Sequence, residues 1–473
     1  MLINGEFVTG RSTFPVYNPF NRQTVGEAAI ATDADLQNAL ELAHSAKCKH
    51  SPVERAGILV ELAKQVGREK ESIAKLIASE SGLCLKDTRY EVNRVISAAE
   101  VAADVAKTMD TDQTDVYLSE GAMGKAHLQV VTEALDLVLG ITPFNHPMNQ
   151  VAHKVFPAIA AGTAMVLKPS PKTPLSALHL GELLMKVGLQ QNLLNVVTSN
   201  DCPVVVGDLV SSPLVDMITF TGGSKVGVAI AQTMAKRGNA LKKYVPELGG
   251  CSSLIINADV DIQLGVKLAI NGCFANSGQR CTAVRRLVVV DSVADRFLDL
   301  FLQGAKQIQL GDPMSPETGM GTLVDENAAT SVEKRVESAI SDGARLLLGH
   351  MRNGASYPPT VLDRVCLDSV LVTEETFGPV APIIRVNDIG EAVQVAKATP
   401  YGLAGAIACK DRGLATEVAN ELKVGQFSWN GVPGYRTEAA PFGGFGLSGN
   451  GQKEGIISAA SGMQRIRTFY EHS

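Results

Sequence analysis

The feature that most constrains the fold is a repeated alternation of short apolar runs and helical stretches, which starts at residue 137. Between the runs, apolar side chains recur at three- and four-residue spacing, as is typical of helices. Strands that alternate with helices pair in parallel through crossover connections. The sequence therefore predicts a parallel sheet in a dinucleotide-type α/β domain. The expected strands are 137–141, 163–167, 194–197, 217–220 and 243–248, and the expected helices are 148–160, 175–186 and 227–237.

The same alternation restarts at Ile255 and predicts a second α/β unit. Two long helical tracts, 53–81 and 87–109, precede the first unit. Between the helical tracts and the first α/β unit, the residues after Tyr117 alternate loosely, as in a hairpin arm. The C-terminal stretch 461–470 also alternates and could add a strand to another subunit. The strands expected in the second unit are 287–290, 345–348 and 371–372, and its helices are 293–309, 327–341 and 391–398.

Composition excludes several classes of function. The 473 residues are enough for two or three domains, and 43 scattered basic residues within a net charge of −6 argue against a nucleic-acid or anionic-membrane partner. No apolar run reaches the length of a membrane span, and the first residues lack a targeting pattern, so we expect a cytoplasmic protein. Eight cysteines without a C-x-x-C pair fit neither a disulfide framework nor a zinc ribbon, and we expect no metal.

The strongest candidate for chemistry is Cys281, which lies in the polar segment 274–282. A packing cysteine normally has apolar neighbours, whereas this one adjoins Arg280, whose positive charge favours the nucleophilic thiolate. Earlier in the chain, Glu247 lies between apolar residues and two glycines. Such surroundings raise the pKa of a carboxylate and suit it to general-base work. We therefore predict that Cys281 is a nucleophile and that Glu247 is its base.

Several polar turns follow the expected strands, and each is ambiguous by itself. Asn145 could donate to an oxyanion or form an Asx turn, and Lys168 could contact a ligand or remain solvated. The glycine pair 222–223 could bind phosphate at a helix N-terminus or form an ordinary turn. Glu375 could contact ribose hydroxyls or merely begin a loop, and 441–444 could be only a tight turn.

Taken together, these motifs resemble the aldehyde dehydrogenase superfamily over nearly the whole chain. The resemblance implies an α/β fold with a Rossmann-like NAD(P)-binding domain, an α/β catalytic domain and a small oligomerisation arm. It implies residues 1–116 and 134–249 for the first, 250–446 for the second, and 117–133 with 447–473 for the arm and C-terminal segment. The motifs that carry it are Pro143–Asn145, Lys168-Pro169-Ser170, Phe220-Thr221-Gly222, Glu247-Leu248-Gly249-Gly250, Gly278-Gln279-Arg280-Cys281, Glu375-x-Phe377-Gly378-Pro379 and Pro441-Phe442-Gly443-Gly444.

The resemblance also implies a mechanism and its residues. Cys281 would attack an aldehyde to give a thiohemiacetal, hydride would pass to a nicotinamide, and water activated by Glu247 would hydrolyse the thioester. Asn145 and the backbone N–H of Cys281 would form the oxyanion hole. Lys168 and Glu375 would hold ribose hydroxyls, with Gly222 and Gly223 beside the pyrophosphate. The remaining expected cofactor contacts are Thr142, Pro143, Phe144, Ser170, Leu248, Gly249 and Phe377.

Two further implications concern the cofactor and the assembly. NAD-preferring members often carry a glutamate three residues past the ribose lysine, and here that position is Pro171. The cofactor expected is therefore NAD, with NADP also possible, because the carboxylate that repels a 2′-phosphate is missing. Family members are usually homodimers or homotetramers, and 117–133 and 461–470 could provide the contacts.

Four donor side chains map onto the substrate funnel that the resemblance implies: Arg94, His146, Arg280 and Arg436. A funnel for apolar aldehydes would not place so many charges where desolvation is costly. Arginine forks suit a phosphonate, phosphate or carboxylate, so we expect a small anionic aldehyde. In the alternative interpretation, Arg94 and Arg280 only pair with acids such as Glu91 or Glu438.

Local stretches narrow the resemblance to the phosphonoacetaldehyde dehydrogenases, which implies oxidation of phosphonoacetaldehyde to phosphonoacetate. The rivals within this chemistry are succinic semialdehyde, sulfoacetaldehyde and glyceraldehyde 3-phosphate or another phosphorylated sugar aldehyde. A CoA-acylating enzyme or a non-catalytic relative remains an alternative, although the presence of Glu247, Cys281 and Asn145 argues against both. The stretches that carry the narrower resemblance are 80–84, 90–94, 145–154 and 432–436.

Overall fold

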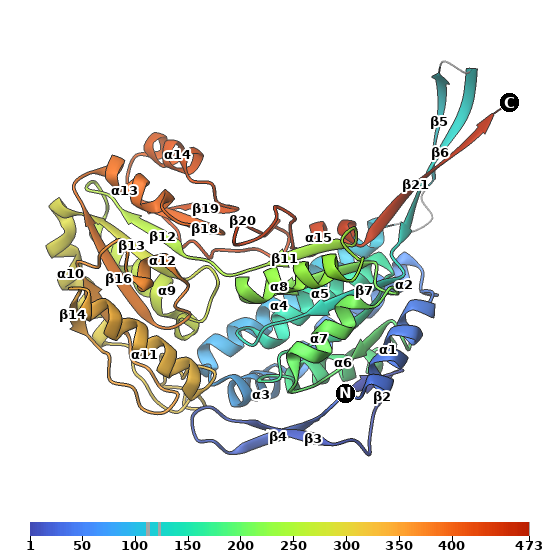
Figure 1. Ribbon diagram of the computed structural model, residues 1–473, viewed down its shortest axis with the longest axis horizontal. Coiled ribbons are helices and arrows are strands. Elements are labelled where there is room, and N and C mark those ends of the chain that lie inside the picture. The colour runs from blue at the N-terminus through green and yellow to red at the C-terminus, as the bar shows by residue number, and fades with distance from the viewer. Residues whose placement is uncertain (110–113, 122–123, 473) are drawn as a thin grey trace.

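The chain folds into two α/β lobes, each built on a seven-stranded sheet, and a three-stranded arm that projects away from the first lobe (Figure 1). This computed structural model describes residues 1–109, 114–121 and 124–472, with all of their side chains except those of 114–121 and 124–125. The N-terminus lies on the first lobe, and the C-terminal strand ends near the tip of the arm (Figure 1).

The first lobe contains the parallel sheet that the alternation predicted. Its parallel strands are β7 (Leu137–Ile141), β8 (Ala164–Lys168), β9 (Leu194–Val196), β10 (Met217–Thr221) and β11 (Lys243–Glu247). They lie in the order β11-β10-β7-β8-β9, and the short strands β1 (Leu2–Ile3) and β2 (Glu6–Phe7) extend the β9 edge in antiparallel pairing. The order reverses between β7 and β10, and ligands of open α/β sheets bind beyond the carboxyl ends of the strands at such a point.

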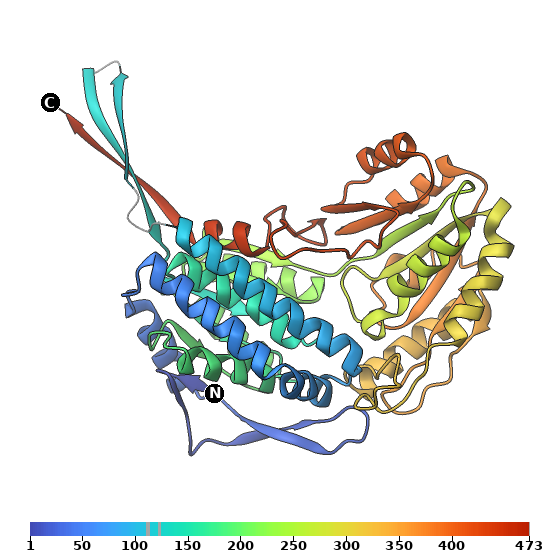
Figure 2. The same ribbon diagram turned by 180° about the vertical axis from the view of Figure 1, so that it is seen from behind.

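Helices cover both faces of this sheet, and one of them is buried on every side. All residues of α5 (Pro147–Ala161) are buried, because this helix packs between the sheet and the long helices α2 (Pro52–Arg68) and α4 (Leu85–Thr108), which Figure 2 shows in front. Polar side chains on such a helix need partners inside the protein. The other helices are α1 (Asp33–Ser45), α6 (Leu175–Lys186), α7 (Cys202–Ser211) and α8 (Ser224–Lys236).

Two segments differ from the sequence expectation. The helical tract predicted over 53–81 consists of two helices, α2 and α3 (Lys70–Ser81), because Glu69 leaves the helical conformation and ends one helix as it begins the next. The predicted strand 371–372 is wrong, because these residues lie in the short helix α12 (Val370–Thr373), where the hydroxyl of Ser369 accepts the N–H of Leu371.

The second lobe is built on a sheet with the order β14-β15-β16-β13-β12-β18-β19, in which only the β14–β15 pair is antiparallel. Its strands are β12 (Ser252–Ile256), β13 (Val284–Val290), β14 (Arg345–Leu348), β15 (Thr360–Asp363), β16 (Val380–Val386), β18 (Ala404–Ala408) and β19 (Gln426–Trp429). Its helices are α9 (Ile262–Phe274), α10 (Asp291–Lys306), α11 (Glu326–Ser341), α13 (Ile389–Lys397) and α14 (Arg412–Glu421).

Two hairpins lie outside the lobes. The arm consists of β5 (Thr114–Gly121), β6 (Gly124–Ala134) and β21 (Gln464–His472) in antiparallel pairing, while residues 122 and 123 of the predicted arm lie outside the described residues. The hairpin β3 (Thr13–Tyr17) and β4 (Thr24–Ala29) runs from the first lobe to the edge of the second (Figure 1).

The two sheets meet end to end, and this contact positions the candidate site. Glu247 is the last residue of β11 at the carboxyl edge of the first sheet, and the chain then enters β12 at the amino-terminal edge of the second. A Cβ on Gly250 would lie 2.4 Å from the carbonyl oxygen of Cys281, so this glycine allows the linker to pass directly against the cysteine.

Candidate active site

Cys281 follows a tight left-handed turn that is held in place by a residue from another helix. Asn276, Ser277 and Gly278 have φ angles of 59°, 53° and 68°, which are unusual for side-chain-bearing residues. The carboxylate of Asp87, on α4, accepts the N–H of Asn276 at 3.1 Å. The turn therefore fixes the backbone that leads into the cysteine.

Asn145 is buried beside this turn and bonded to it twice. Its Nδ2 donates to the carbonyl oxygen of Gln279 at 2.8 Å, and its own carbonyl oxygen accepts Nδ2 of Asn276 at 2.9 Å. An amide nitrogen carries two hydrogens, so one remains for a ligand. This geometry suits the oxyanion role expected for Asn145, and it identifies Asn276 as a supporting residue that the sequence analysis missed.

The Cys281 thiol is not activated by its neighbour in the way that the sequence suggested. Loss of hydration raises the pKa of Cys281 to about 12, and the charges of Glu247 and Glu375 act in the same direction. The positive charge of Arg280 lowers this pKa by less, and NH2 of Arg280 donates to the carbonyl oxygen of Asn271 at 2.7 Å. The resting form is therefore the thiol, and attack requires a base.

Glu247 is buried at the end of β11, and among the described residues neither of its carboxylate oxygens has a hydrogen-bond partner. Burial raises its pKa well above the ordinary value, and the nearby charge of Glu454 adds to this effect. A raised pKa for Glu247 is what the sequence analysis expects. Gly443 allows the close approach on the other side, since its φ is 152° and a Cβ there would lie 2.6 Å from Oε1 of Glu247.

A buried ion pair, Lys154 with Glu454, lies near Glu247. Lys154, on the fully buried helix α5, pairs with the carboxylate of Glu454 and donates to Oγ1 of Thr219 at 2.9 Å. Oγ1 of Thr219 lies 3.1 Å from Oε1 of Glu454. The sequence analysis missed this pair, although a lysine within an apolar helix signals a buried counter-charge.

All eleven residues expected to contact the cofactor line one cavity of about 340 Å³ at the switch point of the first sheet. Asn145, Glu247 and Cys281 lie at the same cavity, so a ligand that fills it reaches the cysteine. Gly223 precedes α8 and has open space where a Cβ would be, as a phosphate site at a helix N-terminus needs. The eleven residues are Thr142, Pro143, Phe144, Lys168, Ser170, Gly222, Gly223, Leu248, Gly249, Glu375 and Phe377.

Within this cavity two polar side chains are held in place. Nζ of Lys168 donates to Sγ of Cys202 at 2.8 Å, and Cys202 is a lining residue that the sequence analysis missed. Oε1 of Glu375 accepts the N–H of Gly250 at 3.1 Å, and burial raises the pKa of Glu375 to about 7. A Cβ on Gly249 would lie 2.4 Å from the Glu375 carboxylate, so a larger residue at position 249 would collide with that carboxylate.

The four expected substrate contacts have different surroundings. Arg94 is held by Glu438 through two bonds, Nε to Oε1 at 2.7 Å and NH2 to Oε2 at 3.1 Å, so the alternative pairing is found for this residue. Arg280 bonds to backbone carbonyls at the end of α9 rather than to Glu91 or Glu438. His146 is partly buried, and its Nδ1 lies 3.8 Å from the carboxylate of Glu91, beyond hydrogen-bond distance.

Arg436 has one hydrogen-bonding partner and one stacking partner among the described residues. Its guanidinium stacks 4.2 Å above the ring of Phe442, and NH2 lies 3.2 Å from Nδ1 of His153. Its Nε is buried and has no partner among the described residues. The charge of Arg436 lowers the pKa of both Cys281 and Glu247, which places this cation beside the candidate site.

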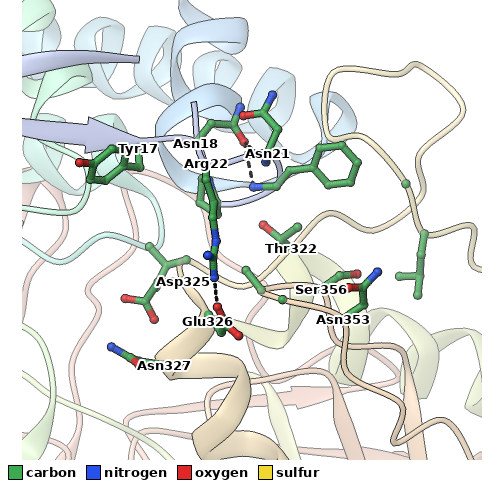
Figure 3. Close-up of a pocket in the computed structure, with 17 residues that line it drawn as sticks. Tyr17, Asn18, Asn21, Arg22, Thr322, Asp325, Glu326, Asn327, Asn353 and Ser356 are labelled. Carbon is green, nitrogen blue, oxygen red and sulfur yellow. Dashed lines mark hydrogen bonds and ion pairs between the residues drawn. The ribbon is translucent and has the colours of Figure 1, made fainter. Parts of the chain in front are cut away.

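A separate cavity lies elsewhere and contains none of the predicted site residues. It has a volume of about 900 Å³ and separates the tip of the β3–β4 hairpin, residues 17–22, from the second lobe. Figure 3 shows Arg22 reaching across this cavity to Glu326, with which it forms an ion pair. The cavity is therefore a groove between the hairpin and the second lobe, separate from the site at Cys281.

Three further features concern the described residues alone. There, no three His, Cys, Asp or Glu side chains are grouped as metal ligands would be. No helix in that part of the chain is long and apolar enough to span a membrane. The eight cysteines are free thiols, five of them buried or half-buried outside the cavity at Cys281.

Comparison with known proteins places this geometry in a family. The family model for the aldehyde dehydrogenase family matches residues 7–469. Sulfoacetaldehyde dehydrogenase of Neptuniibacter caesariensis is 34% identical over 464 residues, which cover 97% of this chain and 99% of that protein. Lactaldehyde dehydrogenase of Methanocaldococcus jannaschii is 36% identical, with 99% of each chain covered. The crystal structure of glyceraldehyde-3-phosphate dehydrogenase GapN from Methanocaldococcus jannaschii, complexed with NADP, superposes with a TM-score of 0.90 at 33% identity over 98% of this chain and 99% of that chain.

Proposed function

The chain belongs to the aldehyde dehydrogenase family of NAD(P)-dependent oxidoreductases, and from this membership we propose that it oxidises phosphonoacetaldehyde to phosphonoacetate. In this reaction Cys281 is the nucleophile, Glu247 the base, and Asn145 with the backbone N–H of Cys281 the oxyanion hole. The observation that supports an anionic substrate is Arg436, a half-buried guanidinium whose buried Nε has no partner among the described residues and whose charge acts on the Cys281 thiol.

The side chains account for the proton transfers of this reaction. Glu247, whose pKa is raised, takes the proton of the Cys281 thiol, and sulfur bonds to the aldehyde carbon while Asn145 stabilises the oxyanion. The eleven cavity residues would hold NAD(P), which would supply the hydride acceptor needed to oxidise the adduct to the thioester level. Glu247 releases the thiol proton to solvent and then removes a proton from water, whose oxygen bonds to the acyl carbon. The carbon–sulfur bond breaks, the carboxylate leaves, and the Cys281 sulfur recovers a proton from Glu247.

Two of the similar proteins are named for anionic aldehydes, which supports a substrate of this class. Sulfoacetaldehyde carries a sulfonate, and glyceraldehyde 3-phosphate carries a phosphate. A guanidinium recognises such tetrahedral oxyanions through paired N–H donors. Sulfoacetaldehyde is the second candidate substrate, because its dehydrogenase is 34% identical to this chain.

The test is the rate of NADH or NADPH formation with a panel of aldehydes. The panel contains phosphonoacetaldehyde, sulfoacetaldehyde, succinic semialdehyde, glyceraldehyde 3-phosphate, lactaldehyde and propanal. Phosphonoacetaldehyde is expected to give the highest kcat/KM. Arg436→Leu is expected to reduce it about 100-fold, which corresponds to about 2.7 kcal/mol for a lost charge-assisted contact.

The control is Arg89→Leu, which removes a half-buried arginine of α4 that pairs only with Glu71 among the described residues. This variant is expected to keep wild-type kinetics with every aldehyde. A higher kcat/KM with sulfoacetaldehyde than with phosphonoacetaldehyde would identify sulfoacetaldehyde as the substrate and would still agree with an anion contact at Arg436. Equal turnover of phosphonoacetaldehyde and propanal would contradict the proposal.

We also propose that the protein assembles as a homodimer or homotetramer through the arm. β21 is exposed along nearly its whole length and presents the apolar side chains Ile466, Phe469 and Tyr470. An exposed strand with apolar side chains is a site for pairing with another chain. Light scattering after size-exclusion chromatography measures the assembly, and a monomer at micromolar concentration would contradict it.

A further inference from the structure

The carboxylate of Glu438 accepts hydrogen bonds from two donors, Arg94 and His153, and a third, Arg436, is bonded to it through His153. Arg94 comes from α4, His153 from α5, and Arg436 from the same loop as Glu438, between β19 and β20 (Phe445–Gly446). Glu438 accepts two bonds from Arg94 and one from Nε2 of His153. Glu438 and His153 are both buried, so none of these contacts is a solvated surface pair.

The direction of each hydrogen bond follows from the charge of Glu438. Burial works against that charge, but the hydrogen bonds from His153 and Arg94 lower the pKa of Glu438 to about 2. An ionised carboxylate only accepts, so Nε2 of His153 carries the hydrogen. Burial, with the charge of Arg436, lowers the pKa of His153 to about 4, so Nδ1 is a free acceptor. That acceptor takes NH2 of Arg436 at 3.2 Å.

The charges in this group do not cancel. Arg94 and Glu438 neutralise each other through the two-bond pair, and His153 is neutral, so Arg436 holds the unmatched positive charge. Its other acidic neighbours are less available, because Glu454 is paired with Lys154 and the raised pKa of Glu247 reduces the charge of that carboxyl. A half-buried cation without a counter-ion attracts an anionic ligand.

The loop that carries Arg436 also touches the nucleophile's own segment. A Cβ on Gly434 would lie 2.3 Å from Oγ1 of Thr282, the residue that follows Cys281. The loop is held at its other end, where the N–H of Ile456 donates to the carbonyl oxygen of Glu438 at 3.2 Å. Movement of Glu438 would therefore displace Arg436 relative to Cys281.

We propose that Glu438 is a positioning residue for substrate specificity. It occupies Arg94 and fixes the His153 tautomer, so that within this group Arg436 is the residue held with an uncompensated charge for the anionic end of the aldehyde. This inference rests on the proposed function and adds to it, because it assigns the anion contact to Arg436 and gives Arg94 an indirect role through Glu438.

The test compares the preference for phosphonoacetaldehyde over propanal, measured as a ratio of kcat/KM values, in the wild type and in variants. Glu438→Gln keeps the size of the side chain but removes the charge that fixes the group. It is expected to raise KM for phosphonoacetaldehyde about 30-fold with kcat changed less than about threefold, and to reduce the preference about 30-fold. Glu438→Asp is expected to restore most of the preference.

The matched control is Glu71→Gln, whose carboxylate also makes a two-bond pair with an arginine of α4 but is exposed. It is expected to keep the wild-type preference. A second pair of variants serves if Glu438→Gln does not fold. His153→Gln can donate to Glu438 and accept from Arg436, and it is expected to keep the preference. His153→Leu can do neither, and it is expected to lose the preference.

Each outcome separates the two proposals. A wild type that prefers phosphonoacetaldehyde, with a Glu438→Gln variant that keeps this preference, would overturn the positioning role and leave the proposed function intact. Equal losses with both aldehydes would show a merely structural role and would also overturn it. A wild type without any preference for the anion would overturn the proposed function, and the positioning role with it.

Discussion

Nζ of Lys168 lies 2.8 Å from Sγ of Cys202, and the two residues come from different strand-to-helix turns of the same sheet. Both line the cavity proposed for the cofactor, and Cys202 is only half-buried there. A ligand that occupies this cavity must cover the thiol.

The first prediction is that NAD(P) protects Cys202 from alkylation. At a cofactor concentration ten times its Kd, the rate of modification by iodoacetamide is expected to fall about 11-fold, because only the free protein reacts. Peptide mass spectrometry measures the rate at each cysteine. The exposed Cys366, outside the cavity, is the control and is expected to react at an unchanged rate. Equal rates at Cys202 with and without cofactor would place the ligand elsewhere.

The second prediction concerns Glu247 as the base. Glu247→Gln is expected to reduce kcat about 100-fold or more, because loss of a general base costs about 10²–10⁴-fold. Glu374→Gln is the matched control, since Glu374 is an exposed carboxylate that pairs with Arg335 outside the cavity. Intact-protein mass spectrometry after mixing with aldehyde and cofactor measures any acyl-enzyme that accumulates on Cys281. Wild-type turnover by Glu247→Gln would refute the assignment.

The third prediction is a pH dependence for Cys281. Because its pKa is raised to about 12, the thiolate fraction of the free enzyme is expected to rise about tenfold for each pH unit between pH 7 and pH 10. The alkylation rate of Cys281 measured across this range is expected to follow the same slope. A plateau below pH 9 would mean that the folded protein lowers the pKa of this thiol instead.

The fourth prediction concerns Gly443, whose backbone approaches the carboxylate of Glu247. Gly443→Ala and Gly188→Ala both force an alanine into positive φ, at 152° and 92°, which is expected to cost about 1 kcal/mol of stability, and the Cβ at 443 adds a collision with the backbone oxygen of Gln452 at 2.6 Å. Only the first places a Cβ against Glu247, because Gly188 faces open space. Gly443→Ala is therefore expected to lose activity, by about tenfold or more for a displaced base. Similar activity in the two variants would show that the close approach is unimportant.

The sequence alone predicted the five parallel strands of the first sheet and the polar turns at their ends, but only part of the second sheet, in which β15, β16, β18 and β19 were not predicted. These features depend on local patterns: apolar periodicity sets strands and helices, and polar turns at the ends of parallel strands meet at one edge. The eleven expected cofactor residues meet in one cavity for this reason. The split helix at Glu69 escaped prediction, because apolar periodicity continues on both sides of the break.

The tertiary structure decided which charges are free and which are paired. Arg94 and Glu438 are 344 positions apart, and Lys154 and Glu454 are 300 apart, so no local pattern signals either pair. Arg280 adjoins the nucleophile in sequence, yet its guanidinium bonds to carbonyls of α9, and loss of hydration dominates the pKa of Cys281. The sequence determined the residue types at the site. Only the packing of α4, α5 and the loop of Arg436 determined their charge states, because burial and distant partners set them.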